Sequence, residues 1–152
     1  MKNFLTILSC VILFSCNSQN KVNPEESLTL AYSSALQEQV TLSNKIQQAI
    51  AKGDFASFKS DVDTASVRLD RELSKINDLS VPAELNNYKS SAQEAITAFK
   101  NMTEIGNQFT QLTVNSTEQE YNDLITSFNE LTSSKIPEAI EKVNGQKEKL
   151  IK

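Results

Sequence analysis

The strongest constraint on the fold is a series of long apolar stripes with the three-and-four residue spacing of one face of an α-helix. The clearest stripe has apolar residues at Phe55, Phe58, Val62, Ala65, Leu69, Leu73, Ile76 and Leu79. Charged residues, Glu72 among them, lie between these positions and are expected on a solvated face. Further stripes begin at Leu28, Leu85 and Tyr121. The pattern predicts four long helices, each of which must bury one face.

The chain has only three glycines and three prolines, and several of them stand where a stripe begins or ends. Asn23-Pro24 predicts a helix start, because Asn is a good N-cap and Pro suits the first helical turn. Gly53 predicts the end of that helix, and Asp54 is expected to cap the next one. Pro82 predicts the start of the third helix. Thr117-Glu118-Gln119-Glu120 is a capping box and predicts the start of the fourth.

Two residues interrupt the helical pattern from within a stripe. Pro137 removes a backbone donor and crowds the preceding turn, so a kink or short break is expected near Ser134. Gly106 costs about 1 kcal/mol relative to alanine inside a helix. We therefore expect a neighbouring backbone or bulky side chain to approach Gly106 closely.

These stripes and their short connections predict an all-α fold, an up-down-up-down four-helix bundle. Helices of about 26 to 34 residues are roughly 40–50 Å long. In an alternative arrangement, two helical hairpins pair with a second molecule. We favour a monomer, because four stripes can cover one another without help.

The N-terminus has the sequence of features that is typical of a bacterial export signal: a basic residue, an apolar run and a cysteine. Lys2 precedes an apolar run over residues 4–14, which suits a signal-peptide core and is too short to span a bilayer as a helix. Leu13-Phe14-Ser15-Cys16 resembles the lipobox of bacterial lipoproteins, in which the cysteine is acylated and becomes the new N-terminus. Cys10 fits the same pattern, but its use would leave an apolar core of about six residues. Cys16 is the predicted lipidation site; the alternatives are a soluble protein with an apolar first helix and an uncleaved anchor.

The chain is thus expected to comprise a signal peptide (1–15), a lipidated tether (16–23) and a bundle domain (24–152). Removing 15 residues from 152 leaves 137, a length suited to one domain, and the loss of Lys2 takes the formal net charge from −4 to −5. Cys10 would leave with the signal peptide and Cys16 would carry the lipid, so no thiol would remain for a disulfide. This acidity disfavours nucleic acid as a partner. The expected partners are the membrane, through the N-terminal lipid, and an unidentified envelope protein.

The chain contains no histidine, which excludes much of the chemistry found in helical bundles. Di-iron sites with Glu-x-x-His motifs, haem attachment through Cys-x-x-Cys-His and Ser-His-Asp catalysis all need that residue. No glycine-rich phosphate loop occurs. Most paired carboxylates lie two residues apart, and on a helix such side chains point in different directions. We expect no catalytic site, no metal site and no cofactor.

Three tyrosines, Tyr32, Tyr88 and Tyr121, lie on predicted buried stripes, where each hydroxyl needs a partner or a route to the rim. Tyr88, Tyr121, Met102 and Gly106 are the candidate lining of a small pocket. The alternative for these residues is ordinary core packing.

One short motif points to a modification. Asp63-Thr64-Ala65 resembles the Asp-Ser/Thr-aliphatic sequence at which exported proteins of Bacteroidota are O-glycosylated. It lies in the middle of a predicted helix.

Several segments of the chain resemble segments of a known protein family. They are Leu30-Ala31-Tyr32 with the residues up to 42, Asp54-Phe55, Leu79-Ser80-Val81-Pro82-Ala83-Glu84, and residues 88–99. Together they make the chain similar to small helical lipoproteins of Bacteroidota and spirochaetes, often labelled surface proteins. The resemblance covers most of the mature chain and implies an envelope location, with no established activity or functional residues.

The main functional expectation is a lipid-anchored helical bundle with a structural or protein-interaction role. Its expected location is the outer membrane, on the periplasmic or the surface face. The alternative is a ligand-binding module of the envelope, similar to a sensor domain.

Overall fold

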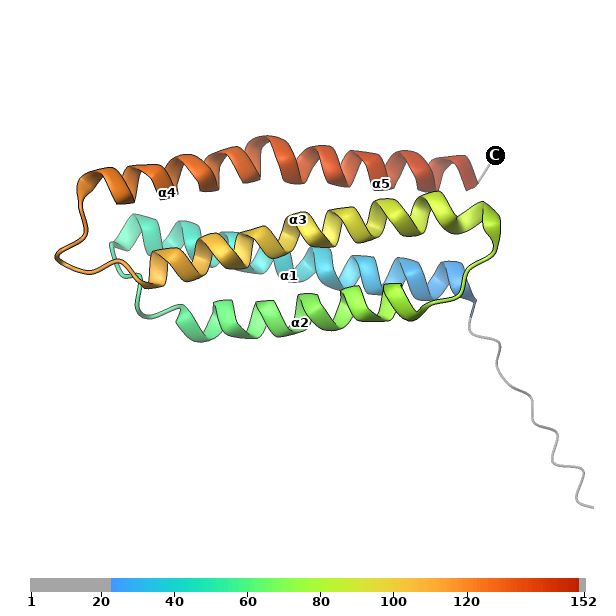
Figure 1. Ribbon diagram of the computed structural model, residues 1–152, viewed down its shortest axis with the longest axis horizontal. Coiled ribbons are helices and arrows are strands. Elements are labelled where there is room, and N and C mark those ends of the chain that lie inside the picture. The colour runs from blue at the N-terminus through green and yellow to red at the C-terminus, as the bar shows by residue number, and fades with distance from the viewer. Residues whose placement is uncertain (1–22, 151–152) are drawn as a thin grey trace, which may run out of the picture.

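The computed structural model describes residues 23–150, so the predicted signal peptide, Cys16 and most of the tether lie outside the described residues. The helices are α1 (Pro24–Lys52), α2 (Lys59–Asp78), the 3-10 turn η1 (Ala83–Leu85), α3 (Asn86–Thr110), α4 (Glu118–Glu130), the π-helical segment η2 (Leu131–Lys135) and α5 (Ile136–Leu150). Because α4, η2 and α5 follow one another without a gap, they form one long C-terminal helix (Figure 1). The described chain is an up-down-up-down four-helix bundle, which confirms the predicted fold class. No helix between residues 23 and 150 is long and apolar enough to cross a membrane.

The ends of α1 are those that the sequence predicts. Asn23 caps the helix, its side-chain oxygen accepting a hydrogen bond from the Glu25 backbone N–H at 3.0 Å. Gly53 ends it in the left-handed conformation, with φ of 67°, and its N–H donates to the carbonyls of Ala49 and Ile50. Glycine favours that conformation because it has no Cβ atom to clash with the backbone.

The expected start of the second helix is wrong. Helix α2 begins at Lys59, and Asp54 instead accepts a hydrogen bond from the Ser57 backbone N–H at 3.3 Å within the connection. This turn takes Phe55 out of the helical stripe, and its ring stacks on Phe109 of α3 with centroids 5.4 Å apart. Phe58 stays buried at the helix start.

Helix α3 lies at the centre of the bundle and contacts α1, α2 and the C-terminal helix. Its buried face meets the apolar stripes of the other helices. The largest fully buried apolar side chains are Leu28, Leu42 and Ile46 of α1, Val62, Leu69 and Ile76 of α2, and Tyr88, Ile96, Phe99, Met102 and Phe109 of α3.

Gly106 lies where side chains of α1 and α2 approach α3 closely. A Cβ atom at Gly106 would lie 3.0 Å from Cγ2 of Val62 and 3.4 Å from Cδ1 of Ile46. The predicted close approach of a bulky side chain is confirmed, because the missing side chain lets α1 and α2 pack directly on α3.

The expectation that Glu72 lies on a solvated face is wrong. Its side chain is buried and only 2% exposed. Lys75 Nζ contacts both of its carboxylate oxygens, at 2.9 and 2.8 Å, and Arg71 Nε donates to Oε1 at 3.0 Å. The two cations are themselves largely exposed and cover the acid. A buried carboxylate is tolerated here because its oxygens are paired.

The predicted break near Ser134 is confirmed as the π-helical segment. The N–H of Ile136 donates to the carbonyl of Leu131, five residues earlier. The hydroxyls of Thr132 and Ser133 donate to the carbonyls of Phe128 and Asn129 at 2.8 and 2.7 Å. A wider turn and these hydroxyl donors accommodate the missing N–H of the following proline without ending the helix.

Candidate functional site

Two connections far apart in the sequence meet at one end of the bundle. They are residues 53–58, between α1 and α2, and residues 111–117, between α3 and α4 (Figure 1). We call these connections, with the first turn of α4, the distal tip. Asn23 lies at the opposite end, and the 29 residues of α1 place about 44 Å between the two.

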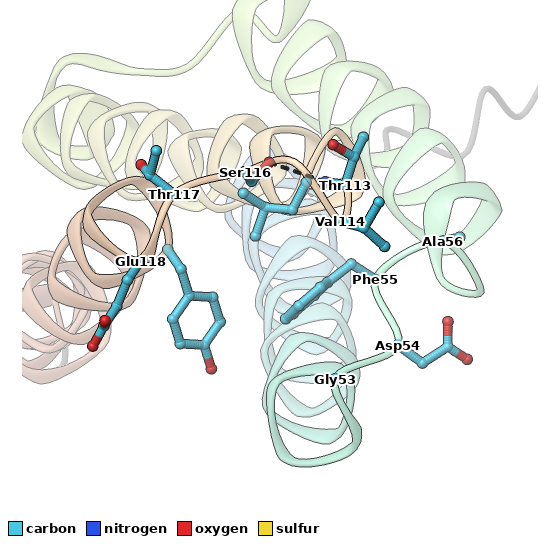
Figure 2. Close-up of a pocket in the computed structure, with 11 residues that line it drawn as sticks. Gly53, Asp54, Phe55, Ala56, Thr113, Val114, Ser116, Thr117 and Glu118 are labelled. Atoms are coloured by element: carbon cyan, nitrogen blue, oxygen red, sulfur yellow. Dashed lines mark hydrogen bonds between the residues drawn. The ribbon is translucent and has the colours of Figure 1, made fainter.

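The distal tip contains a hollow of about 630 Å³, which we call the tip hollow (Figure 2). Its lining residues are Gly53, Asp54, Phe55, Ala56, Leu112, Thr113, Val114, Ser116, Thr117, Glu118 and Tyr121. The volume lies within the range of roughly 300–1,000 Å³ that is usual for ligand sites.

Aromatic rings form the inner wall of the tip hollow. The ring of Phe55 packs between Phe109, on which it stacks, and Tyr121, whose ring centroid lies 5.9 Å away at an angle of 56°. Phe55 and Tyr121 are half-buried, whereas Val114 is fully exposed. The wall therefore combines fixed rings with an apolar side chain that stands in solvent.

The only charged residues that line the tip hollow are two acids, Asp54 and Glu118. Figure 2 shows them on opposite sides, with their carboxylates directed outward. Neither forms an ion pair with any described residue. The rim of the hollow is thus negatively charged.

A second hollow, of about 420 Å³, lies on another face of α4. Its lining includes Leu112 and Ser116, which it shares with the tip hollow, together with Glu120, Asp123 and Leu124. The N-terminal half of α4 therefore stands between two hollows.

The start of α4 is nevertheless fixed by its capping box. The Thr117 N–H donates to Glu120 Oε2 at 2.7 Å, and the Glu120 N–H donates to Thr117 Oγ1 at 3.2 Å. Hydrogen bonds from the Thr117 backbone and hydroxyl lower the pKa of Glu120, so this carboxylate stays ionised near the tip.

The structure does not bring the four predicted pocket residues together. Tyr88, Met102 and Gly106 are buried along α3, and the 18 residues from Tyr88 to Gly106 span about 27 Å. Side chains of Val62 and Ile46 occupy the space beside Gly106. Only Tyr121 lines the tip hollow.

The other tyrosines lie in the half of the bundle that begins at Asn23. Tyr88 shares a hydrogen bond of 3.0 Å with the Thr29 hydroxyl. The Tyr32 hydroxyl is buried and has no hydrogen-bond partner among the described residues. Burial, and secondarily Tyr88, raises the pKa of Tyr32 to about 12.

The remaining predicted positions are Cys16 and the possible glycosylation motif. Cys16 lies outside the described residues. Thr64 is exposed on α2, and the preceding Asp63 pairs with Lys59 at 3.0 Å. Glycosylation of Thr64 stays a prediction.

The sequence pattern does not predict the tip hollow, because it places Asp54 and Phe55 at the start of a helix, whereas both lie in the connection before α2. Comparison of the chain with protein-family models, with characterised proteins and with solved structures finds no match. Within residues 23–150, no group of three or more acids and thiols is placed to hold a metal ion. The fold and the site define a four-helix bundle with an open, acid-rimmed apolar hollow at one end.

Proposed function

We propose that this protein is a lipid-anchored bundle of the bacterial cell envelope, held by Cys16, with a non-enzymatic role in binding another envelope protein. The observation that carries this proposal is the position of the tip hollow, at the end of the bundle opposite Asn23. Residues 17–22 reach at most about 20 Å when fully extended, so an anchored bundle would stay close to its membrane. The tip hollow would then face away from the anchor.

The sequence supports the location in this proposal. The lipobox-like Leu13-Phe14-Ser15-Cys16 follows an apolar run of signal-peptide length. The outer membrane, on its periplasmic or surface face, is the proposed site of action. The lack of histidine throughout the chain favours a role without catalysis.

Ligand binding is the second candidate role, and the volume of the tip hollow favours it. The core beside Gly106 does not offer an alternative pocket, because Val62 fills it. We prefer a protein partner, since the fully exposed Val114 beside the hollow suits a broad contact better than an enclosed small molecule.

The anchor can be tested in a bacterium that processes lipoproteins. Wild type is expected to partition into the detergent phase with an acylated N-terminus at Cys16. Cys16→Ser is expected to be soluble or to stay unprocessed, and Cys10→Ser is the matched control that should remain anchored. Processed, membrane-bound Cys16→Ser would disprove the lipoprotein assignment.

A further inference from the structure

Apolar surface gathers at the distal tip. Val114 is 101% exposed, more than Val67 at 70% or Leu30 at 63%, the next most exposed large apolar side chains among the described residues. It lies beside the half-buried Phe55, Leu112 and Tyr121 in one hollow. Covering such a cluster removes apolar surface from water and favours association.

Contacts within the bundle hold two parts of the wall of the tip hollow. Phe55 is fixed by its stack on Phe109. In the α3–α4 connection, the Thr113 N–H donates to Ser116 Oγ at 3.0 Å, the contact drawn in Figure 2. The Asn115 N–H also donates to the Thr113 hydroxyl, at 3.2 Å. A preformed surface loses less conformational freedom on binding.

Charge selects the kind of partner. Asp54 and Glu118 line the tip hollow, and Glu120 and Asp123 line the hollow beside it. Neither lining includes a Lys or Arg. By contrast, the groove between α1 and α2 near Leu30 is lined by Arg68 and Arg71. Both hollows at the distal tip therefore combine apolar residues with acids alone, and they complement a segment that is apolar and basic.

We infer that the tip hollow binds a segment of a protein partner in which an aromatic or aliphatic side chain is flanked by Lys or Arg. The apolar side chain enters against Phe55 and Tyr121, and the flanking cations meet Asp54 and Glu118. Rigid aromatic residues of this kind commonly supply most of the binding energy at protein interfaces. This inference rests on the proposed function and names the partner chemistry of that site.

The test uses the full-length acylated chain in detergent micelles as the target for a phage-displayed random-peptide library. Enriched peptides are expected to combine Lys or Arg with an aromatic or aliphatic residue. The strongest is then synthesised, and its affinity is measured by calorimetry at two salt concentrations. Affinity should fall as salt rises, because the contacts at the rim are exposed.

Matched variants assign that binding to the distal tip. Val114→Ser should weaken the peptide about tenfold, whereas Val67→Ser, the same change on the exposed face of α2, should leave affinity unchanged. Glu118→Gln should weaken it roughly threefold at low salt. Glu141→Gln, at an exposed acid of α5, should have no effect. Circular dichroism of each variant checks that the bundle is folded.

Several results would overturn the inference. One is a library that shows no enrichment over empty micelles, or that enriches acidic or uncharged peptides. Another is a Val67→Ser variant that loses as much peptide affinity as Val114→Ser. A third is a distal tip that binds small amines but no peptide. The anchor is measured separately. An acylated protein that enriches no basic peptide would refute this inference and leave the lipoprotein proposal standing, whereas an unacylated protein would refute that proposal.

Discussion

Helix α3 and the C-terminal helix differ sharply in how they are buried. Helix α3 buries ten residues along its length. The longer C-terminal stretch of residues 118–150 buries only Phe128, Leu131, Ile136 and Val143. Helices α1, α2 and α3 contact one another, whereas the C-terminal helix contacts mainly α3. The bundle is thus a tightly packed three-helix body with a fourth helix laid against its central member.

This difference explains where the hollows form. In α4 the apolar residues Tyr121, Leu124 and Ile125 are half-buried, and the two hollows at the distal tip flank them. A helix that is packed from one side leaves space at its edges. The proposed binding site therefore lies beside the α-helix that buries the fewest residues, where apolar groups are left uncovered by the core.

The largest expected effect on stability comes from removing a phenylalanine ring, either from the three-helix body or from the C-terminal helix. Phe99→Ala should lower the free energy of unfolding by about 3–5 kcal/mol, because Phe99 is fully buried and leaves a cavity. Phe128→Ala should cost less, since the edge of the bundle can close around the gap. Urea denaturation measures both. An equal or larger loss for Phe128→Ala would contradict the comparison.

A second comparison uses the two glycines inside helices. Gly145→Ala should stabilise the protein by roughly 0.5–1 kcal/mol, because a Cβ there meets nothing within 4 Å. Gly106→Ala gains the same helix propensity but brings a Cβ within 3.0 Å of Val62. Its stability should therefore be clearly lower than that of Gly145→Ala, as thermal unfolding would report. Equal stabilisation at both sites would show that α3 is not tightly packed there.

The unpaired hydroxyl of Tyr32 offers a test within the three-helix body. Tyr32→Phe should stabilise the protein by about 1 kcal/mol, because it removes a buried hydroxyl with no partner. Because burial raises the pKa of Tyr32 from 10.0 to about 12, the unfolded chain loses this proton before the folded protein does, and stability falls as pH rises from 10.0 toward about 12. Wild type should accordingly lose more stability over that interval than Tyr32→Phe. If the two curves ran parallel, the Tyr32 hydroxyl would not be buried as described.

The smallest effect concerns the ion pair that joins the C-terminal helix to α3. A hydrogen bond from Lys142 to Glu94 lowers the pKa of that carboxyl. The pair therefore favours folding above about pH 4.5 and is lost as pH falls below it. In Lys142→Gln, NMR titration should find the pKa of Glu94 returned toward its ordinary value. An unchanged pKa would mean that α5 is not held to α3 by this contact.

Local backbone preferences made most of the fold predictable. The Asn23 cap, the left-handed Gly53, the Thr117 capping box and the break near Ser134 all depend on residues close in sequence. At Pro82 only a 3-10 turn begins, and α3 itself starts at Asn86. The start of α2 was not predictable in this way. Asp54 can cap a helix or a local turn, and the choice depends on the stack of Phe55 on Phe109, which is a tertiary contact.

The site was harder to predict than the fold. A stripe shows that Tyr88, Met102 and Gly106 face the core, but it does not show that Val62 fills the space beside the glycine. The tip hollow arises where residues 53–56 meet residues 112–118, and no local pattern joins them. Burial of Glu72 likewise depends on how Arg71 and Lys75 fold over it.

Native-state hydrogen exchange tests the division into a three-helix body and a peripheral fourth helix most directly. Amides of α3 from Ala95 to Gly106 should exchange only through global unfolding. Amides of α4 from Tyr121 to Ser127 should open at a lower free energy, because half-buried side chains hold that segment. Equal protection of α3 and α4 would contradict the account, since the fourth helix would then be as firmly packed as the other three.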